Sequence, residues 1–175
     1  MSSRDLFHPL VVCAVLVASG CGDDDTSSGP LPPTYATFDT IVTRSCRFGG
    51  SCHGGPSPRR ASNFLNVEMF ADDYRMAFVG VPGNKNDQMY LIMPGDPEAS
   101  YLWHKINATH TTPPACGQGD PMPRLAEEGL PQNERDAIRM WIEMGAPGPD
   151  GTPAEVPAAL PGYTVCPPPM TDGGM

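Results

Sequence analysis

Proline is the feature that most limits what this chain can fold into. Its 22 prolines are concentrated in loops and at the ends. Proline fixes the backbone angle φ and cannot donate a backbone hydrogen bond, so it argues against long regular elements in those stretches. Residues 148–175 are especially rich in proline and glycine, so we expect the folded part at about residues 35–147, one small domain with a thin core.

The N-terminus is typical of an export signal. The apolar run "PLVVCAVLVASG" is too short to span a bilayer, and it ends in "LVASGCGDDD". This resembles a bacterial lipoprotein signal, which predicts a signal peptide over residues 1–20 and lipidation of Cys21; an ordinary secretory signal is the alternative. We therefore expect an exported protein, lipid-anchored to a bacterial membrane on its periplasmic or cell-surface side. Residues 21–34 are polar and rich in Gly, Pro and Ser, as in a flexible tether.

The net charge of −9 comes without a basic stripe, which argues against nucleic acid as a partner. Acidity suits a basic redox partner protein, and solubility explains it equally well. No nucleophile elbow or paired carboxylates stand out, so we do not expect an enzyme.

Helical spacing of apolar residues predicts an all-α domain with about four helices and long Gly/Pro-rich loops. The helices are expected near residues 36–46, 65–81, 96–108 and 130–145, with Asp96 as the N-cap of the third and Gly145 ending the fourth. Only "MYLIM", residues 89–93, has a weak strand pattern.

Four cysteines remain after the signal and the lipid site: Cys46, Cys52, Cys116 and Cys166. An even number outside the cytosol usually forms disulfides. Alternatively, Cys46 and Cys52 bond a haem and Cys116 pairs with Cys166, which would pin the tail (residues 148–175) to the domain. The cysteine count fits both interpretations.

The stretch "SCRFGGSCHGG" places His53 directly after Cys52, as at the end of the haem attachment motif C-x-x-C-H. Five residues separate Cys46 from Cys52, whereas the motif has two. These five residues include Gly49 and Gly50. A c-type haem needs two thiols, a histidine beside the second thiol, and often a distant methionine. Met122, between two prolines in "ACGQGDPMPRL", is the candidate methionine.

The order "CHGG", "LIMPGDPEASYLWHKI", "GDPMPRL" and "LPQNERDAIRMWIEMGA" resembles the c-type cytochrome-like domains of secreted proteins and lipoproteins in myxobacteria and planctomycetes. The likeness covers about residues 38–147. It implies a small cytochrome c-like helical fold and electron transfer by one covalently attached haem c. By this resemblance Cys46 and Cys52 attach the haem, His53 and Met122 are the axial ligands, and Trp141 packs the last helix against the first.

Two other interpretations remain. One is a haem-free structural or binding module with two disulfides, and the other is a copper protein that uses His53, Met122 and a cysteine. Met93 and His110 compete with Met122 as the distal ligand, whereas His104 is expected to be a surface or packing residue.

The lipoprotein motif generates the first prediction. Replacing Cys21 with serine removes the lipidated thiol, so the protein should move from the membrane to the soluble fraction on ultracentrifugation. A Cys13→Ser variant is the control and should stay on the membrane. If the Cys21 variant sediments as fully as the wild type, the lipid anchor is wrong.

Overall fold

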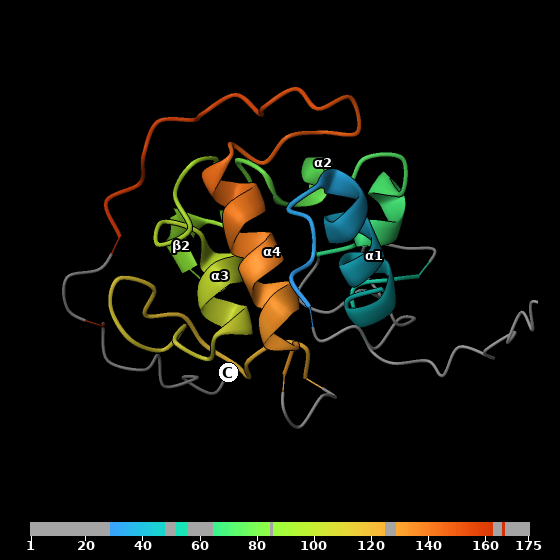
Figure 1. Cartoon of the computed structure of the whole chain (residues 1–175). Helices are drawn as coiled ribbons and strands as arrows, with labels where there is room; N and C mark the ends of the chain where they lie inside the picture. Colours follow the sequence, from blue (N-terminus) through green and yellow to red (C-terminus); the bar gives the residue numbers. More distant parts are fainter. Residues whose placement is uncertain are drawn as a thin grey trace, which may run out of the picture.

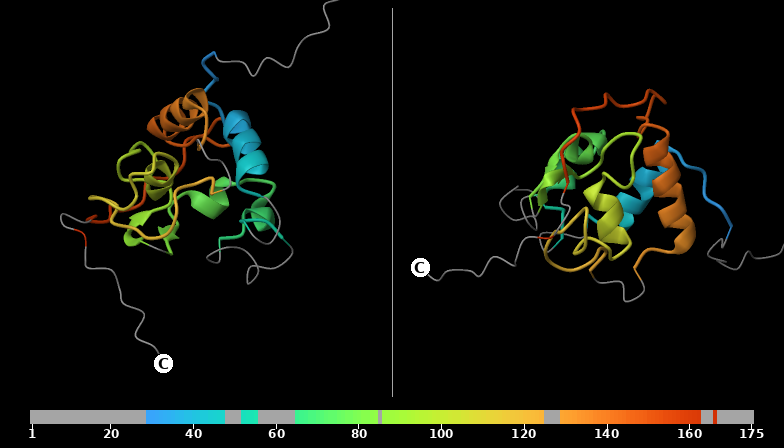
Figure 2. Two further views of the ribbon diagram at one scale, coloured as in Figure 1. Left: turned by 90° about the horizontal axis from the view of Figure 1, so that it is seen from below. Right: turned by 90° about the vertical axis from the view of Figure 1, so that its left-hand side faces the viewer.

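The computed structural model describes residues 29–47, 52–55, 65–84, 86–124, 129–162 and 166. Figure 1 shows α4 between α1 and α3, and the left view of Figure 2 shows the same arrangement from below. In order along the chain, the elements are α1 (Tyr35–Ser45), the 3-10 helix η4 (Val67–Phe70), α2 (Arg75–Phe78), β1 (Pro82–Gly83), β2 (Asn86–Tyr90), α3 (Tyr101–Ile106) and α4 (Gln132–Glu143).

The core is centred on the contact between α1 and α4. The ring of Phe38 on α1 stacks on that of Trp141 on α4, with centroids 4.1 Å apart and planes 14° from parallel. The ring of Phe78 meets Phe38 edge-on at 5.8 Å. Trp141 has an exposed fraction of 0 %, and its indole N–H donates to the Pro147 carbonyl at 2.9 Å. The indole therefore joins the two long helices and also holds the start of the tail.

Local sequence explains where α1 begins. The hydroxyl of Thr34 accepts a hydrogen bond from the Thr37 amide, which satisfies one of the donors that a helix N-terminus leaves free. Phe38, Ile41 and Val42 follow at helical spacing and are all buried. The expected stripe is therefore the buried face of the helix.

The expectation of an all-α, cytochrome c-like fold is wrong. The strands β1 and β2 form an antiparallel two-stranded hairpin in which Pro82 pairs with Tyr90 and Gly83 with Asn86. Of the helices in the described ranges, only α1 and α4 are long, with 11 and 12 residues; α2 has four and α3 has six. Prolines and glycines between the apolar segments keep the other elements short, and the described fold is therefore mixed.

The helix expected over residues 65–81 is two separate pieces. Asn66 caps η4 by accepting a hydrogen bond from the Glu68 amide, and Asp73 accepts one from the Arg75 amide at the start of α2. Between them, the Tyr74 amide donates to the Tyr35 hydroxyl instead of continuing a helix. The short polar side chains of Asn66 and Asp73 bond to backbone amides and interrupt the helix that the apolar spacing predicts.

Asp96 does not cap a long third helix, although it does accept a hydrogen bond from the Ala99 amide. That bond closes a turn, and α3 begins only at Tyr101. Ser100 lies between them: its hydroxyl donates to the Asp96 carbonyl and accepts from the Met93 amide. The turn therefore ties the start of α3 to the end of the hairpin segment.

The tail returns across the domain. Figure 1 shows it leaving the end of α4 and descending beside β2. The guanidinium of Arg75 packs so closely on Gly148 that a Cβ there would lie 2.2 Å from it, and Gly162 donates to the Gln88 carbonyl at 3.3 Å. A disulfide joins Cys166 to Cys116 and so attaches the tail to the domain. One of the two interpretations of the cysteines predicted this pair.

The proposed signal peptide (residues 1–20), Cys21 and most of the tether lie outside the described residues. The first described residue, Gly29, accepts a hydrogen bond from the Asn133 side chain on α4. In the described ranges, none of the helices has both the length and the apolar composition that a membrane crossing requires.

The tail attachment generates the second prediction. The Cys116–Cys166 bond spans 50 residues. Replacing both cysteines with alanine should lower the free energy of unfolding by about 2–4 kcal/mol, because the unfolded chain regains the freedom of that loop. Denaturant unfolding measures the loss, and limited proteolysis should cut near residues 148–162 faster. An unchanged unfolding midpoint would mean that the disulfide does not hold the tail.

Candidate functional site

The Cys–His turn, defined here as Cys46, Cys52, His53, Gly54 and Gly55, is anchored to the end of α1. Cys46 is the C-cap of that helix, and its amide still donates to the Val42 carbonyl at 2.9 Å. The His53 amide then donates to the Cys46 carbonyl at 3.0 Å. This bond closes the loop between the two cysteines and brings Cys52 and His53 back to the first thiol.

The imidazole of His53 has a defined orientation. Its Nδ1 atom lies 3.1 Å from the Leu65 carbonyl oxygen. A carbonyl only accepts, so Nδ1 carries the hydrogen, and in the neutral ring the lone pair is then on Nε2. A second bond, from the Val67 amide to the His53 carbonyl at 2.8 Å, holds the backbone of the same residue. Donation of one ring N–H to a carbonyl is the usual support for a metal-binding histidine.

The two glycines let the turn pack closely. A Cβ on Gly54 would lie 2.5 Å from the Arg47 carbonyl oxygen, so a larger residue does not fit there. Gly55 has a φ of 115°, which side-chain-bearing residues rarely adopt. Its amide donates to the Glu68 carboxylate at 2.5 Å and its carbonyl accepts from Asn66 at 2.9 Å. The two glycines of "CHGG" are therefore required by packing.

Cys46 and Cys52 are free, half-buried thiols. Cys46 packs against the main core, and this burial raises the pKa of its thiol to about 12, with a further rise from the neighbouring Cys52 sulfur. Cys46 is therefore neutral at ordinary pH. Gly49 and Gly50, which the sequence singled out for their freedom to bulge, lie outside the described residues.

Met122 lies in the loop before α4 and is bonded to α3. Its amide donates to the Lys105 carbonyl at 3.0 Å. The Lys105 ammonium donates to the carbonyls of Gln118 and Asp120 at 2.8 and 2.7 Å, so this one residue holds the loop at three positions between residues 118 and 122. The bonds just described tie Met122 to α3, and they tie His53 to α1 and to the start of η4. The fold thus holds these two proposed ligands on different elements.

The competing ligands have structural roles. Met93 is buried, with its amide bonded to Ser100. His104 is packed as expected, with its ring nitrogens bonded to Thr109 and to the Glu98 carbonyl.

His110 is also buried, and its Nε2 donates to the Gly119 carbonyl at 2.7 Å. Burial lowers the pKa of His110, and its Nδ1 has no hydrogen-bond partner among the described residues. It lies in the same loop region as Met122 and remains the alternative distal ligand.

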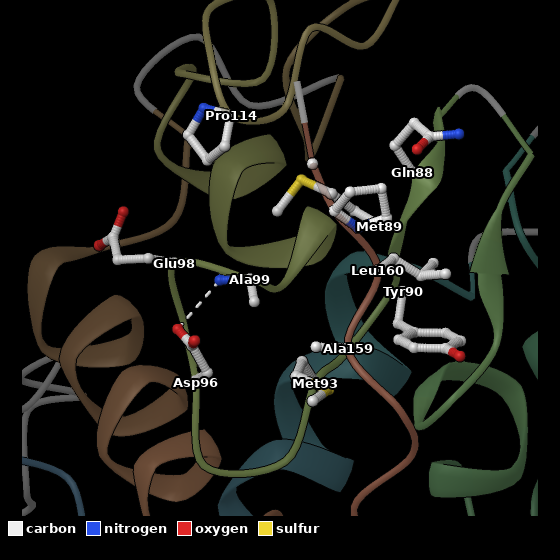
Figure 3. A pocket seen from close by; sticks show the side chains of 12 residues that line it. Gln88, Met89, Tyr90, Met93, Asp96, Glu98, Ala99, Pro114, Ala159 and Leu160 are labelled. Carbon is white, nitrogen blue, oxygen red and sulfur yellow. Dashed lines mark hydrogen bonds between the residues drawn. The ribbon is translucent and has the colours of Figure 1, made fainter. Parts of the chain in front are cut away.

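A groove of about 220 Å³ that the sequence did not predict lies between β2, the 96–99 turn and the tail (Figure 3). Met89, Met93 and Leu160 give it apolar walls. Its two carboxylates already have partners, because Asp96 accepts from Ala99 and Glu98 from the Trp103 indole. Sequence gave no signal for this groove because the position of the tail depends on the disulfide and on long-range contacts.

In the described part of the chain, no group of three or more His, Cys, Asp or Glu side chains is arranged to hold a metal ion. Comparisons with protein-family models, curated proteins and solved structures give no match to this chain. The function must therefore be argued from the site itself.

The raised pKa of Cys46 can be tested by the rate at which its thiol is labelled. The pKa of Cys46 is about 12 in the fold against an ordinary 9.0. At pH 8 its thiolate fraction should be about a thousandfold lower than in the unfolded chain, because three pKa units separate the two states. Iodoacetamide should therefore label Cys46 of the reduced, haem-free protein about a thousandfold more slowly in buffer than in urea. Peptide mass spectrometry measures the two rates.

The same shift fixes the pH dependence of stability. The folded pKa is the higher one, so the contribution of Cys46 is complete below pH 9 and is lost as pH rises from about 9 to about 12. Equal labelling rates at pH 8 in buffer and in urea would show that the thiol is not buried.

Proposed function

We propose that this chain is a one-electron carrier with a covalently attached haem c, bound at Cys46, Cys52 and His53. The observation that carries the proposal is the Cys–His turn. It returns to the first cysteine, and its imidazole donates Nδ1–H to the Leu65 carbonyl, which in the neutral ring leaves the lone pair on Nε2. This is the local geometry that a proximal histidine next to a haem-bonding thiol needs.

Each residue has a defined role in this proposal. The thiols of Cys46 and Cys52 form the thioether bonds, and the Nε2 atom of His53 is the proximal ligand. Met122 is the distal ligand on the loop that Lys105 clamps. The haem iron supplies the chemistry by cycling between its ferrous and ferric states, and ligation by histidine and methionine favours a comparatively high potential.

The burial of Cys46 suits a thioether. Cys46 packs against the main core, and a thioether sulfur is neutral and apolar. A copper site that uses His53, Met122 and a cysteine ranks third.

A haem-free, disulfide-stapled structural or binding module is the second candidate. It is favoured by the closeness of the two free cysteines, since the Cys52 sulfur contributes to the raised pKa of Cys46. The Cys116–Cys166 disulfide provides one staple in either case.

Location and partners complete the proposal. The lipoprotein motif at Cys21 supports a location of the carrier on a bacterial membrane, on its periplasmic or cell-surface side. There it would exchange electrons with a redox partner protein, and the tether would limit its distance from the membrane.

The fourth prediction tests the ligands. The mature chain, made in a host with active cytochrome maturation, should be red and keep its haem through denaturing electrophoresis. Met122→Ala should lose the low-spin spectrum and lower the reduction potential, because a methionine ligand raises it. Met93→Ala is the matched control and should cost stability but leave the spectrum unchanged.

A colourless protein would contradict the proposal. A red protein whose spectrum survives Met122→Ala but changes in His110→Ala would keep the haem and reassign the distal ligand to His110.

A further inference from the structure

One buried side chain, Asn66, ties the Cys–His turn to the segment that orients the His53 ring. We propose that Asn66 is a positioning residue that fixes the orientation and tautomer of the His53 imidazole. The inference deepens the proposed function, because it concerns the same histidine, and it rests on that function only where iron binding is concerned.

The orientation of the His53 ring is tied to the Leu65 carbonyl. Nδ1 of His53 donates to the Leu65 oxygen, so the ring follows any movement of that peptide unit. Asn66 is the next residue along the chain. Whatever fixes Asn66 therefore fixes the acceptor that selects the Nδ1–H form of the imidazole.

Asn66 is bonded across to the turn. Its side-chain NH₂ donates to the Gly55 carbonyl at 2.9 Å, while the Val67 amide donates to the His53 carbonyl at 2.8 Å. These two bonds hold residues 65–67 alongside residues 53–55. The His53–Leu65 bond is the third connection between the same two short segments.

The other end of the Asn66 amide completes a ring of hydrogen bonds. Its side-chain oxygen accepts from the Glu68 amide at 3.0 Å, and the Glu68 carboxylate accepts from the Gly55 amide at 2.5 Å. Both backbone groups of Gly55 are thus satisfied by this pair. The position needs a donor at one end and an acceptor at the other, which asparagine provides and aspartate does not.

Burial makes the connection difficult to replace. Asn66 has an exposed fraction of 4 %, and Gly55 is also buried. Without the amide, the Gly55 carbonyl loses a donor in a place that solvent reaches poorly. The turn and the Leu65 carbonyl would then move independently, and the ring would lose its fixed acceptor.

The chain offers a closely matched control residue, Asn86. It has the same exposed fraction of 4 %, its side-chain NH₂ donates to the Ala115 carbonyl, and its oxygen accepts from the amide two residues later, Gln88. The two asparagines share type, burial and hydrogen-bond pattern, but the bonds of Asn86 join β2 to the loop after α3. Substituting Asn86 therefore reproduces the structural cost without touching the turn.

The test uses the full mature chain without haem and with Cys46 and Cys52 reduced. After removal of the signal this chain has three histidines. Long-range ¹H–¹⁵N spectra distinguish the two tautomers of each ring. The wild type should show His53 in the Nδ1–H form. Asn66→Asp and Asn66→Ala should both give a mixture with the Nε2–H form, whereas Asn86→Asp and Asn86→Ala should leave His53 unchanged while lowering the thermal midpoint.

Two results would overturn the inference: His53 shifts that stay at their wild-type values in both Asn66 variants, or an equal change in the Asn86 variants. A parallel measurement on haem-loaded protein should show a changed reduction potential in Asn66→Asp and none in Asn86→Asp. Failure of haem to attach would overturn the proposed function, while the spectra of the haem-free chain would still decide the role of Asn66.

Discussion

The stack of Phe38 on Trp141 is the contact on which the rest of this structure depends. It joins the two long helices, α1 and α4, at the centre of the core. The same indole donates to the Pro147 carbonyl and so sets where the tail leaves the domain. Because the end of α1 carries Cys46, the stack also fixes the first residue of the candidate site. Packing at the centre of the core thus helps to determine the position of the candidate site at the end of α1.

The site is supported from two directions. The Cys–His turn closes on the end of α1 and is held by the segment around Asn66, so its cysteines and histidine share one rigid support. Met122 is supported from α3 by Lys105. A small domain with short elements gains much stability from binding a large apolar group.

Much of the local pattern could be predicted from the sequence. The buried stripe of α1, the long last helix and its aromatic contact with the first follow from apolar spacing and from the resemblance. The hairpin could not be predicted, because Pro82 and Gly83 are typical of loops and pair only through contacts with β2. The break between η4 and α2 depends on whether Asn66 and Asp73 bond to the backbone, which periodicity does not reveal.

The sequence shows Cys46, Cys52 and His53 as a motif. It does not show which other residues hold them in place. Asn66 gave no signal in the sequence, since its role depends on Gly55, which lies eleven residues away. The groove beside β2 was equally hidden, because a tail rich in proline carries no periodicity to place it.

The central claim, that both cysteines carry one haem, is tested most directly by tryptic mass spectrometry of the mature protein. Cleavage after Arg44, Arg47 and Arg59 separates the two cysteines into the peptides SCR and FGGSCHGGPSPR. The account predicts that both peptides are recovered joined to the same haem, even after reduction. The two peptides linked only by a disulfide and without haem would contradict it.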